Sequence, residues 1–400
     1  MRIAMFTNNY KPYIGGVPIS IEHLAEALRE QGHLVYVFAP SYEGQQEEPY
    51  VIRYPSFPFA VAGAPVPNIL TKVFEQKVRE LQIEVIHVHH PALVGNVALR
   101  LRRKLGIPVV FTYHTRYEEY LYYIRGLKSI ERHVGGIEWY LKQFCAQCDM
   151  LFAPTPGMRR YLLERSIIGT PVEVLPTGIP AESFRRDAGE EEAIRQTYKK
   201  GADYLFCTVS RLAKEKNLDF QLEALYCLKQ ILAKRGKTFR HLIIGEGPDR
   251  KHLEQEIALR GLEENVLLLG NVENEEIKNY HGAADAFLFT SKSETQGIVI
   301  LEAMAAGKPV IAVDASGVCD VVVTGENGIL TSENALVFAV RTAELMENEP
   351  LRRQMEQAAA ATAASYCEEK IAEQAAAYYA SVCIAARGHV ARQVQGMLYS

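Results

Sequence analysis

Two glutamates, Glu294 and Glu302, stand close together in the stretch SETQGIVILEAMAAGKPVIA, residues 293–312, with Gly297 between them. Gly297 lets backbone N–H groups approach a phosphate, and the residues after it begin a helix whose N-terminus favours negative charge. A carboxylate is a poor neighbour for a phosphate but a good hydrogen-bond acceptor for sugar hydroxyls. Two carboxylates beside a phosphate-binding turn therefore indicate a site for a sugar nucleotide.

Two cations upstream favour the same chemistry. Arg211 and Lys216 lie in SRLAKEKN, just past a predicted strand, where two positive charges suit a diphosphate. Taken alone, the pair is also compatible with ordinary surface charge. The nearby IIGEGP predicts a tight turn, but it lacks the G-x-G-x-x-G spacing of a dinucleotide fingerprint.

These residues follow strands in a chain that alternates short β-branched runs with amphipathic helical segments. In the first half, the predicted strands are residues 2–6, 34–40, 85–90, 109–114, 150–155 and the run from 172. After the charged, gap-like stretch 182–201, strands are expected in 204–212, 241–247, 266–270, 286–291, 308–313 and 328–331. The pattern predicts an α/β protein with two Rossmann-like parallel sheets.

The predicted domains are residues 1–175, residues 176–365 and a long alanine-rich helix over 366–400. Ligands of open parallel sheets bind beyond the carboxyl ends of the strands, so two such domains facing each other would form a cleft. The chain of 400 residues with 48% hydrophobic content is long enough for two or three domains and excludes a disordered protein.

Charge and targeting signals suggest where the protein works. The net charge is −4, yet the first 180 residues carry a slight basic excess, which could face an anionic surface or be ordinary scatter. The N-terminus lacks the apolar run of a signal peptide, and no stretch approaches the roughly 20 apolar residues of a membrane span. We therefore expect a cytoplasmic protein whose membrane contact, if any, is peripheral.

Neither the cysteines nor the histidines predict a metal site. The seven cysteines are odd in number and scattered, which favours reduced thiols, and the pair Cys145 and Cys148 has no second pair to complete a zinc site. His87 and His89 share one strand face, but no carboxylate or cysteine lies at ligand spacing, so histidines lining a cleft are expected instead.

Together these motifs resemble the retaining glycosyltransferases of family 4, which have the GT-B fold. The resemblance rests on the two glutamates with EAMAAGKPVIA, on SRL with its lysine, and on GGV at 15–17, HVHHP at 87–91 and GNVENEEIKNYHGAADAFLFTS at 270–291. It covers nearly the whole chain. It implies that the first domain binds the acceptor, the second binds a nucleotide sugar, and the C-terminal helix returns to the first domain.

The resemblance also implies roles for single residues. Arg211 and Lys216 would hold the donor diphosphate, Glu302 the ribose hydroxyls and Glu294 the donor sugar. His114 would contact the transferred sugar, and Gly15 and Gly16 would form a loop that closes over the phosphate or the acceptor. Main-chain groups near Asn271 and Val272 would contact the base, and the remaining donor contacts would come from Gln296, Gly297 and Ile298. The catalytic set is therefore Arg211, Lys216, Glu294 and His114, with no cofactor beyond the donor substrate.

One departure from the family pattern indicates which class of acceptor to expect. Many members have glycine, phenylalanine and glycine after the first glutamate, whereas this chain has Thr295, Gln296 and Gly297. That form, with TYHTRYEEYLYYI at 112–124, is similar to the bacterial 1,2-diacylglycerol 3-alpha-glucosyltransferases, which transfer glucose from UDP-glucose to a lipid. A lipid acceptor on the inner face of the cell membrane is therefore expected.

The first domain carries residues suited to an anionic membrane surface, and no nucleic-acid partner is expected. Basic and aromatic side chains draw a peripheral helix to such a surface, although a core helix with a solvated face is the alternative. Gly135 and Gly136 predict two short helices around a bend in residues 124–145. The candidate residues are Tyr113, Tyr117, Tyr120, Tyr122, Tyr123, Arg100, Arg102, Arg103, Lys104, Arg125, Lys128, Arg132, Lys142 and Trp139.

No residue is identified as a carboxylate nucleophile beneath the sugar, so the favoured mechanism is departure of UDP and attack by the acceptor hydroxyl on the same face. The alternative enzyme transfers a hexose to a soluble or polysaccharide acceptor. A non-catalytic sugar-nucleotide-binding protein would not need all four of Arg211, Lys216, Glu294 and Glu302. A periplasmic sugar-binding protein is disfavoured because no signal peptide is recognised.

Overall fold

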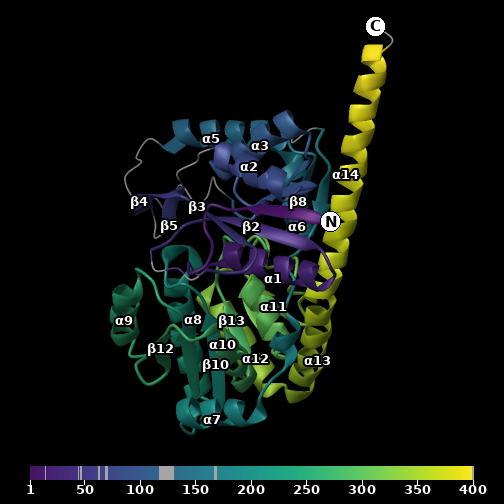
Figure 1. The fold of residues 1–400 in the computed structure, drawn as a ribbon. Helices are drawn as coiled ribbons and strands as arrows, with labels where there is room; N and C mark the ends of the chain where they lie inside the picture. Colours follow the sequence, from purple (N-terminus) through teal and green to yellow (C-terminus); the bar gives the residue numbers. More distant parts are fainter. Residues whose placement is uncertain are drawn as a thin grey trace. The chain divides into compact units, whose positions relative to one another are not determined.

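The computed structural model describes residues 1–13, 15–43, 45, 47–61, 64–67, 71–116, 130–165 and 169–398. The chain divides into two compact units (Figure 1). The first unit comprises Met1–Gly178 together with Glu368–Ser400, and the second comprises Ile179–Cys367. Each unit is built on one parallel sheet, which confirms the predicted α/β class of two Rossmann-like halves.

The first unit contains a seven-stranded parallel sheet in the order β3-β2-β1-β6-β7-β8-β9 and a separate antiparallel pair, β4 and β5. Its strands are β1 (Arg2–Phe6), β2 (Leu34–Pro40), β3 (Val51–Tyr54), β4 (Ser56–Val61), β5 (Ala64–Pro67), β6 (Val85–Val88), β7 (Val109–Thr112), β8 (Met150–Ala153) and β9 (Val172–Val174). Its helices are α1 (Gly16–Glu30), α2 (Thr71–Glu80), α3 (Val94–Leu105), α5 (Ile130–Cys145), α6 (Pro156–Glu164) and α14 (Glu368–Leu398).

The second unit contains a six-stranded parallel sheet in the order β12-β11-β10-β13-β14-β15. Its strands are β10 (Tyr204–Val209), β11 (Phe239–Ile244), β12 (Val266–Gly270), β13 (Ala286–Phe289), β14 (Val310–Val313) and β15 (Gly328–Thr331). Its helices are η2 (Ala181–Phe184), α7 (Ala188–Lys199), η3 (Lys214–Lys216), α8 (Leu218–Ala233), α9 (Arg250–Leu259), α10 (Asn274–Ala283), α11 (Ile298–Ala305), α12 (Ala335–Glu347) and α13 (Glu349–Ser365).

The last helix, α14, packs on the sheet of the first unit beside α1 (Figure 1). Ala372, Ala375 and Tyr379 of α14 are fully buried in one core with Ile21 and Ala25 of α1. Alanine side chains let the two helices approach closely, and the apolar area that they bury holds α14 to the sheet. The long C-terminal helix expected from the sequence is therefore present and belongs to the first unit.

Three expectations from the sequence were wrong in detail. The helix α5 runs continuously through Gly135 and Gly136, so no bend separates two short helices. Glycine costs about 1 kcal/mol per helical position, but the packing of Leu141 and Phe144 in the core stabilises the helix. The stretch 182–201 is not a gap, because α7 begins there with Asp187 as its N-cap. Strands β3, β4 and β5 were not predicted.

In each sheet the strand order reverses at one place, and the loops that follow the two strands there lie next to each other. In the first unit this place lies between β1 and β6, and in the second it lies between β10 and β13. Such switch points are where parallel sheets bind their ligands. The loops after these four strands carry Gly15, His89, Lys216 and Glu294.

Candidate active site

In the second unit, the loops after β10 and β13 are joined by an ion pair between two predicted site residues. The ammonium nitrogen of Lys216 lies 2.5 Å from Glu294 Oε1, and both side chains are mostly buried. Two further hydrogen bonds hold the loops together: Thr290 Oγ1 donates to Lys216 O at 3.1 Å, and Ser291 Oγ donates to Glu215 O at 3.2 Å. The structure therefore brings together the residues expected for the diphosphate and for the donor sugar.

Arg211 lies on the same loop as Lys216. Its guanidinium is about half exposed and pairs with Glu215 Oε1 at 2.7 Å. The glycine turn after β11 packs directly against this loop. A Cβ added to Gly245 would lie only 2.1 Å from Ser210 O, and the backbone N–H of Leu212 donates to Glu246 O. The turn in IIGEGP thus has a structural task, since only glycine lets the two backbones approach this closely.

Gly297 begins α11 as the sequence predicted. It has φ +75°, a left-handed conformation that favours glycine, and Ile298 is the first residue of the helix. Gln296 is 3% exposed beside it. The turn is also crowded from outside: a Cβ added to Gly317, in the loop after β14, would lie 2.4 Å from Glu294 O. Gly317 was not predicted from the sequence, although its residue type, a glycine, could have indicated a close approach of two backbones.

The two glutamates have opposite electrostatic environments. Burial alone would raise the pKa of Glu294, but the charge of Lys216 and its hydrogen bond hold that pKa below its ordinary value. Burial raises the pKa of Glu302, on the second turn of α11, to about 7. Glu294 is therefore a fixed negative charge, whereas Glu302 changes its charge near neutral pH.

The side chain of Val272 is half-buried and packs against the core of the second unit, after the end of β12. Asn271 beside it is exposed. Because the valine side chain packs against the core, its main-chain groups are the ones left to offer polar contacts. Main-chain contacts with the nucleotide base are what the family resemblance implies at this position.

In the first unit, Gly15 and Gly16 lie at the start of α1, in the loop after β1. Gly15 is the N-cap and has an extended backbone, and a Cβ there would lie 3.2 Å from the ring of Tyr13. Gly16 has open space around its Cα. The N-terminus of α1 thus presents backbone N–H groups in a stretch that carries no bulky side chain at these two positions.

A cluster of histidines lies at the end of β6 and in the loops after β6 and β7. His90 Nδ1 accepts the Asn8 backbone N–H at 3.2 Å, which ties the β1 loop to the β6 loop. His89 Nδ1 lies 2.8 Å from His114 Nε2, and both nitrogens of His87 are hydrogen-bonded, to Thr112 and Tyr379. Burial holds the pKa of His114 and of His89 well below the ordinary value of histidine, so both rings are neutral at pH 7.

Several predicted membrane residues have structural partners instead. Tyr113 is 3% exposed in the core, Arg102 pairs with Asp149 at 2.7 Å, and Lys104 pairs with Glu75 at 2.7 Å. Trp139 on α5 is 64% exposed and remains a candidate. Tyr117, Tyr120, Tyr122, Tyr123, Arg125 and Lys128 lie outside the described residues, as does the side chain of Arg132.

Cys145 and Cys148 are buried in the core at the end of α5, and burial raises the pKa of both thiols. Within the described ranges, no three His, Cys, Asp or Glu side chains gather so as to hold a metal ion. The described helices also include none that is long and apolar enough to cross a bilayer.

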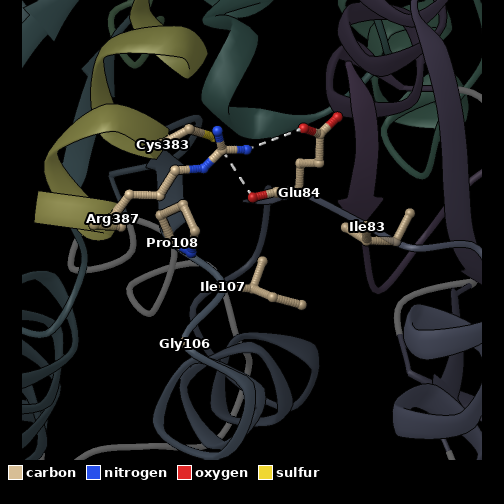
Figure 2. Close-up of a pocket in the computed structure, with 8 residues that line it drawn as sticks. Ile83, Glu84, Gly106, Ile107, Pro108, Cys383 and Arg387 are labelled. Atoms are coloured by element: carbon tan, nitrogen blue, oxygen red, sulfur yellow. Dashed lines mark hydrogen bonds and ion pairs between the residues drawn. The ribbon is translucent and has the colours of Figure 1, made fainter. Parts of the chain in front are cut away.

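A surface depression of about 480 Å³ lies at the opposite edge of the first sheet, before β6 and β7 (Figure 2). There Arg387 of α14 forms an ion pair with Glu84 at 3.6 Å, and Cys383 Sγ donates to Glu84 O (Figure 2). The depression is remote from the carboxyl ends of the strands, and its contacts fasten α14 to the sheet.

Comparisons with known proteins identify the family of the chain. Residues 14–183 match the family model "Glycosyltransferase Family 4", and residues 189–362 match "Glycosyl transferases group 1". The chain is 31% identical to the alpha-monoglucosyldiacylglycerol synthase of Acholeplasma laidlawii, over 84% of this chain and 85% of that protein. It is 30% identical to the synthase of the same name from Streptococcus pneumoniae, over 78% of this chain and 71% of that protein.

The fold is also similar to that of solved structures. The crystal structure of Anabaena HepE in complex with UDP-glucose superposes with a TM-score of 0.74 at 20% identity, covering 95% of this chain and all of that one. The two parallel-sheet units, the two family models and the relatives at 30% identity or more lead to one conclusion. The chain belongs to glycosyltransferase family 4 and has the GT-B fold.

Proposed function

We propose that this glycosyltransferase moves glucose from UDP-glucose to diacylglycerol at the inner face of the cell membrane, with retention of the anomeric configuration. The observation that carries the proposal is the Lys216–Glu294 pair, which joins the loops after β10 and β13 at the switch point of the second sheet. The relatives named alpha-monoglucosyldiacylglycerol synthase support glucose and a lipid acceptor, and the HepE complex supports a UDP-linked donor.

The two parts of the donor, its diphosphate and its sugar, contact side chains of opposite charge. The diphosphate lies against Arg211 and Lys216, which come from one loop, and the N-terminus of α11 adds backbone N–H groups. Glu294 is ionised and accepts hydrogen bonds from the glucose hydroxyls. Its ion pair with Lys216 orients both groups before the donor arrives, so little side-chain entropy is lost on binding.

Transfer proceeds on one face of the sugar. The bond between the anomeric carbon and the phosphate oxygen breaks, the acceptor hydroxyl oxygen bonds to the same carbon on the same face, and its proton passes to the departing phosphate. Arg211 and Lys216 stabilise the charge that grows on that phosphate. By the family resemblance, His114 is the residue proposed to contact the transferred sugar.

The test is a transfer assay with labelled UDP-glucose in three arms: anionic vesicles that contain diacylglycerol, the same vesicles without it, and soluble oligosaccharides. Label is expected in the lipid extract of the first arm alone, with an α linkage in the product. Label in the oligosaccharides would replace the proposal by transfer to a soluble acceptor. UDP-glucose left intact in every arm would contradict the donor assignment.

A further inference from the structure

The histidine at the end of β6 has a task that neither the sequence motifs nor the comparisons assign. His89 is 1% exposed, its Nδ1 lies 2.8 Å from His114 Nε2, and the two rings are nearly parallel, with centroids 5.1 Å apart. His114 itself is half-buried, and its ring is the one expected at the transferred sugar. His89 therefore touches the ring that is expected to contact the sugar.

The hydrogen bond between two neutral imidazoles has a direction. Each neutral ring carries one proton, on Nδ1 or Nε2, so one of the two facing nitrogens donates and the other accepts. If His114 Nε2 donated, the proton of His89 would sit on its own Nε2. Among the described residues His89 Nε2 is fully buried and has no hydrogen-bond partner.

A buried N–H without an acceptor is one of the rarest defects in folded proteins, and an acceptor without a donor is less rare. The neighbouring ring of His87 does not supply an acceptor. Its centroid lies 4.1 Å from that of His89, but both of its nitrogens are already hydrogen-bonded, to Thr112 and Tyr379. The arrangement therefore favours His89 with its proton on Nδ1, donating to His114 Nε2.

We infer that His89 is a positioning residue that holds the His114 ring by its Nε2 and thereby places the proton of His114 on Nδ1. The nitrogen of His114 that does not face His89 is then an N–H donor. The inference rests on the proposed function for the contact between His114 and sugar, but the tautomer of His114 can be measured without any substrate.

The experiment is nitrogen-15 NMR of histidine-labelled full-length protein near neutral pH, with His114 assigned from the spectrum of His114→Gln. In the wild type, His114 Nε2 is expected to be unprotonated and Nδ1 protonated. In His89→Phe the ring should show a mixture of both tautomers, and His89→Asn, whose side-chain amide can donate from about the same place as Nδ1, should restore part of the wild-type pattern. A wild-type His114 with its proton on Nε2, or an unchanged tautomer in His89→Phe, would overturn the inference.

Two further variants separate positioning from general loss of packing. Tyr379→Phe removes the hydroxyl from His87 but leaves the His89–His114 bond, so the His114 tautomer should stay as in the wild type. His241→Phe removes another fully buried imidazole, in the second unit, and should also leave it unchanged. A shift of the tautomer in either control as large as in His89→Phe would contradict a specific role for His89.

Kinetics connect the tautomer to the reaction. His89→Phe should lower kcat about two- to tenfold, the range for loss of one hydrogen bond, and leave UDP binding to the second unit unchanged. A confirmed tautomer in a protein that transfers no glucose would uphold the inference and reject the proposed function.

Discussion

The site's most unusual single group is Glu302, because its pKa of about 7 places its ionisation within the physiological range. The cause is burial, whereas at Glu294 the charge of Lys216 offsets the effect of burial. An ionised carboxylate accepts hydrogen bonds from ribose hydroxyls, whereas the protonated form has lost much of that capacity.

We therefore predict that UDP binds more tightly as the pH rises through 7. Between about pH 6 and pH 8 the ionised fraction of Glu302 rises from roughly a tenth to nine-tenths, so affinity should rise up to about tenfold. Isothermal titration across this range, on the wild type and on Glu302→Gln, measures the effect. The phosphate of UDP also titrates near pH 6, but equally for both proteins. Parallel pH curves for the two proteins would contradict a dependence of UDP binding on the charge of Glu302.

At the scale of elements, the loop after β14 packs closely against the backbone of the proposed donor site. Gly317 has φ +77°, and a Cβ there would lie 2.4 Å from Glu294 O, so this residue lets the loop pass against the backbone of the site. Gly325 has a similar φ of +90° but nothing within 4 Å of the added Cβ. The two glycines form a matched pair that separates crowding from backbone conformation.

Gly325→Ala should lower the free energy of unfolding by about 1 kcal/mol, the cost of a left-handed conformation for alanine. Gly317→Ala should cost more than that and should also weaken UDP binding, because relief of the clash displaces Glu294 and its partner Lys216. Urea unfolding and UDP titration of both variants provide the comparison. Equal losses of stability together with equal UDP affinity would show that the loop after β14 does not support the site.

The helix α5 presents the exposed Trp139 on the first unit. If this helix contacts the bilayer, Trp139→Ala should weaken binding to anionic vesicles roughly tenfold or more, because burial of such a side chain is worth about 1.5–3 kcal/mol. Leu259, on α9 of the second unit, is 80% exposed and provides the control. Vesicle co-sedimentation in which Leu259→Ala loses as much binding as Trp139→Ala would contradict contact through α5.

Elements with strong periodicity were predictable, and elements set by tertiary packing were not. The buried strands of both sheets and the helices α1, α3, α11 and α14 follow apolar patterns that exist within each segment. The continuous helix α5 depends on Leu141 and Phe144 reaching the core, which outweighs the two glycines. The short strand β3 depends on pairing with β2, which its own four residues do not reveal.

The same distinction applies to the site. Glu294, Gly297 and Lys216 could be named because their residue types and spacing fit a nucleotide sugar, and the structure places them together. The direction of the His89–His114 hydrogen bond and the fit of Gly317 against Glu294 depend on contacts between segments far apart in the sequence.

At the scale of the whole molecule, buried neutral histidines set the response to acid. In the first unit burial lowers the pKa of His87 to about 3 and that of His90 to about 4, and holds those of His89 and His114 well below 6.5. In the second unit His241 and His281 each have a pKa of about 3. Below pH 6.5 the unfolded chain binds protons that the folded chain does not, so the folded state loses stability as the pH falls from 6.5 towards 4.

Each such histidine contributes up to about 1.4 kcal/mol per pH unit, so the first unit, with four, should lose stability more steeply than the second, with two. Trp139, the only tryptophan, lies in the first unit and reports on its unfolding. Between about pH 7.5 and pH 5.5, the urea midpoint of tryptophan fluorescence should fall further than that of circular dichroism, which follows both units. Equal shifts in both signals would mean that the histidines do not distinguish the units.

The central claim is that the Lys216–Glu294 pair forms part of the site from which glucose passes to lipid, and one measurement tests it most directly. Labelled glucose in diacylglycerol-containing vesicles is measured for the wild type, for Lys216→Ala, and for Lys292→Ala, whose lysine pairs with Glu333 at 2.8 Å nearby. Both variants lose one lysine of the same region. The account predicts that Lys292→Ala keeps wild-type transfer, whereas Lys216→Ala loses on the order of a hundredfold or more, as expected when a group that stabilises developing charge is removed. Transfer by Lys216→Ala at the level of Lys292→Ala would contradict it.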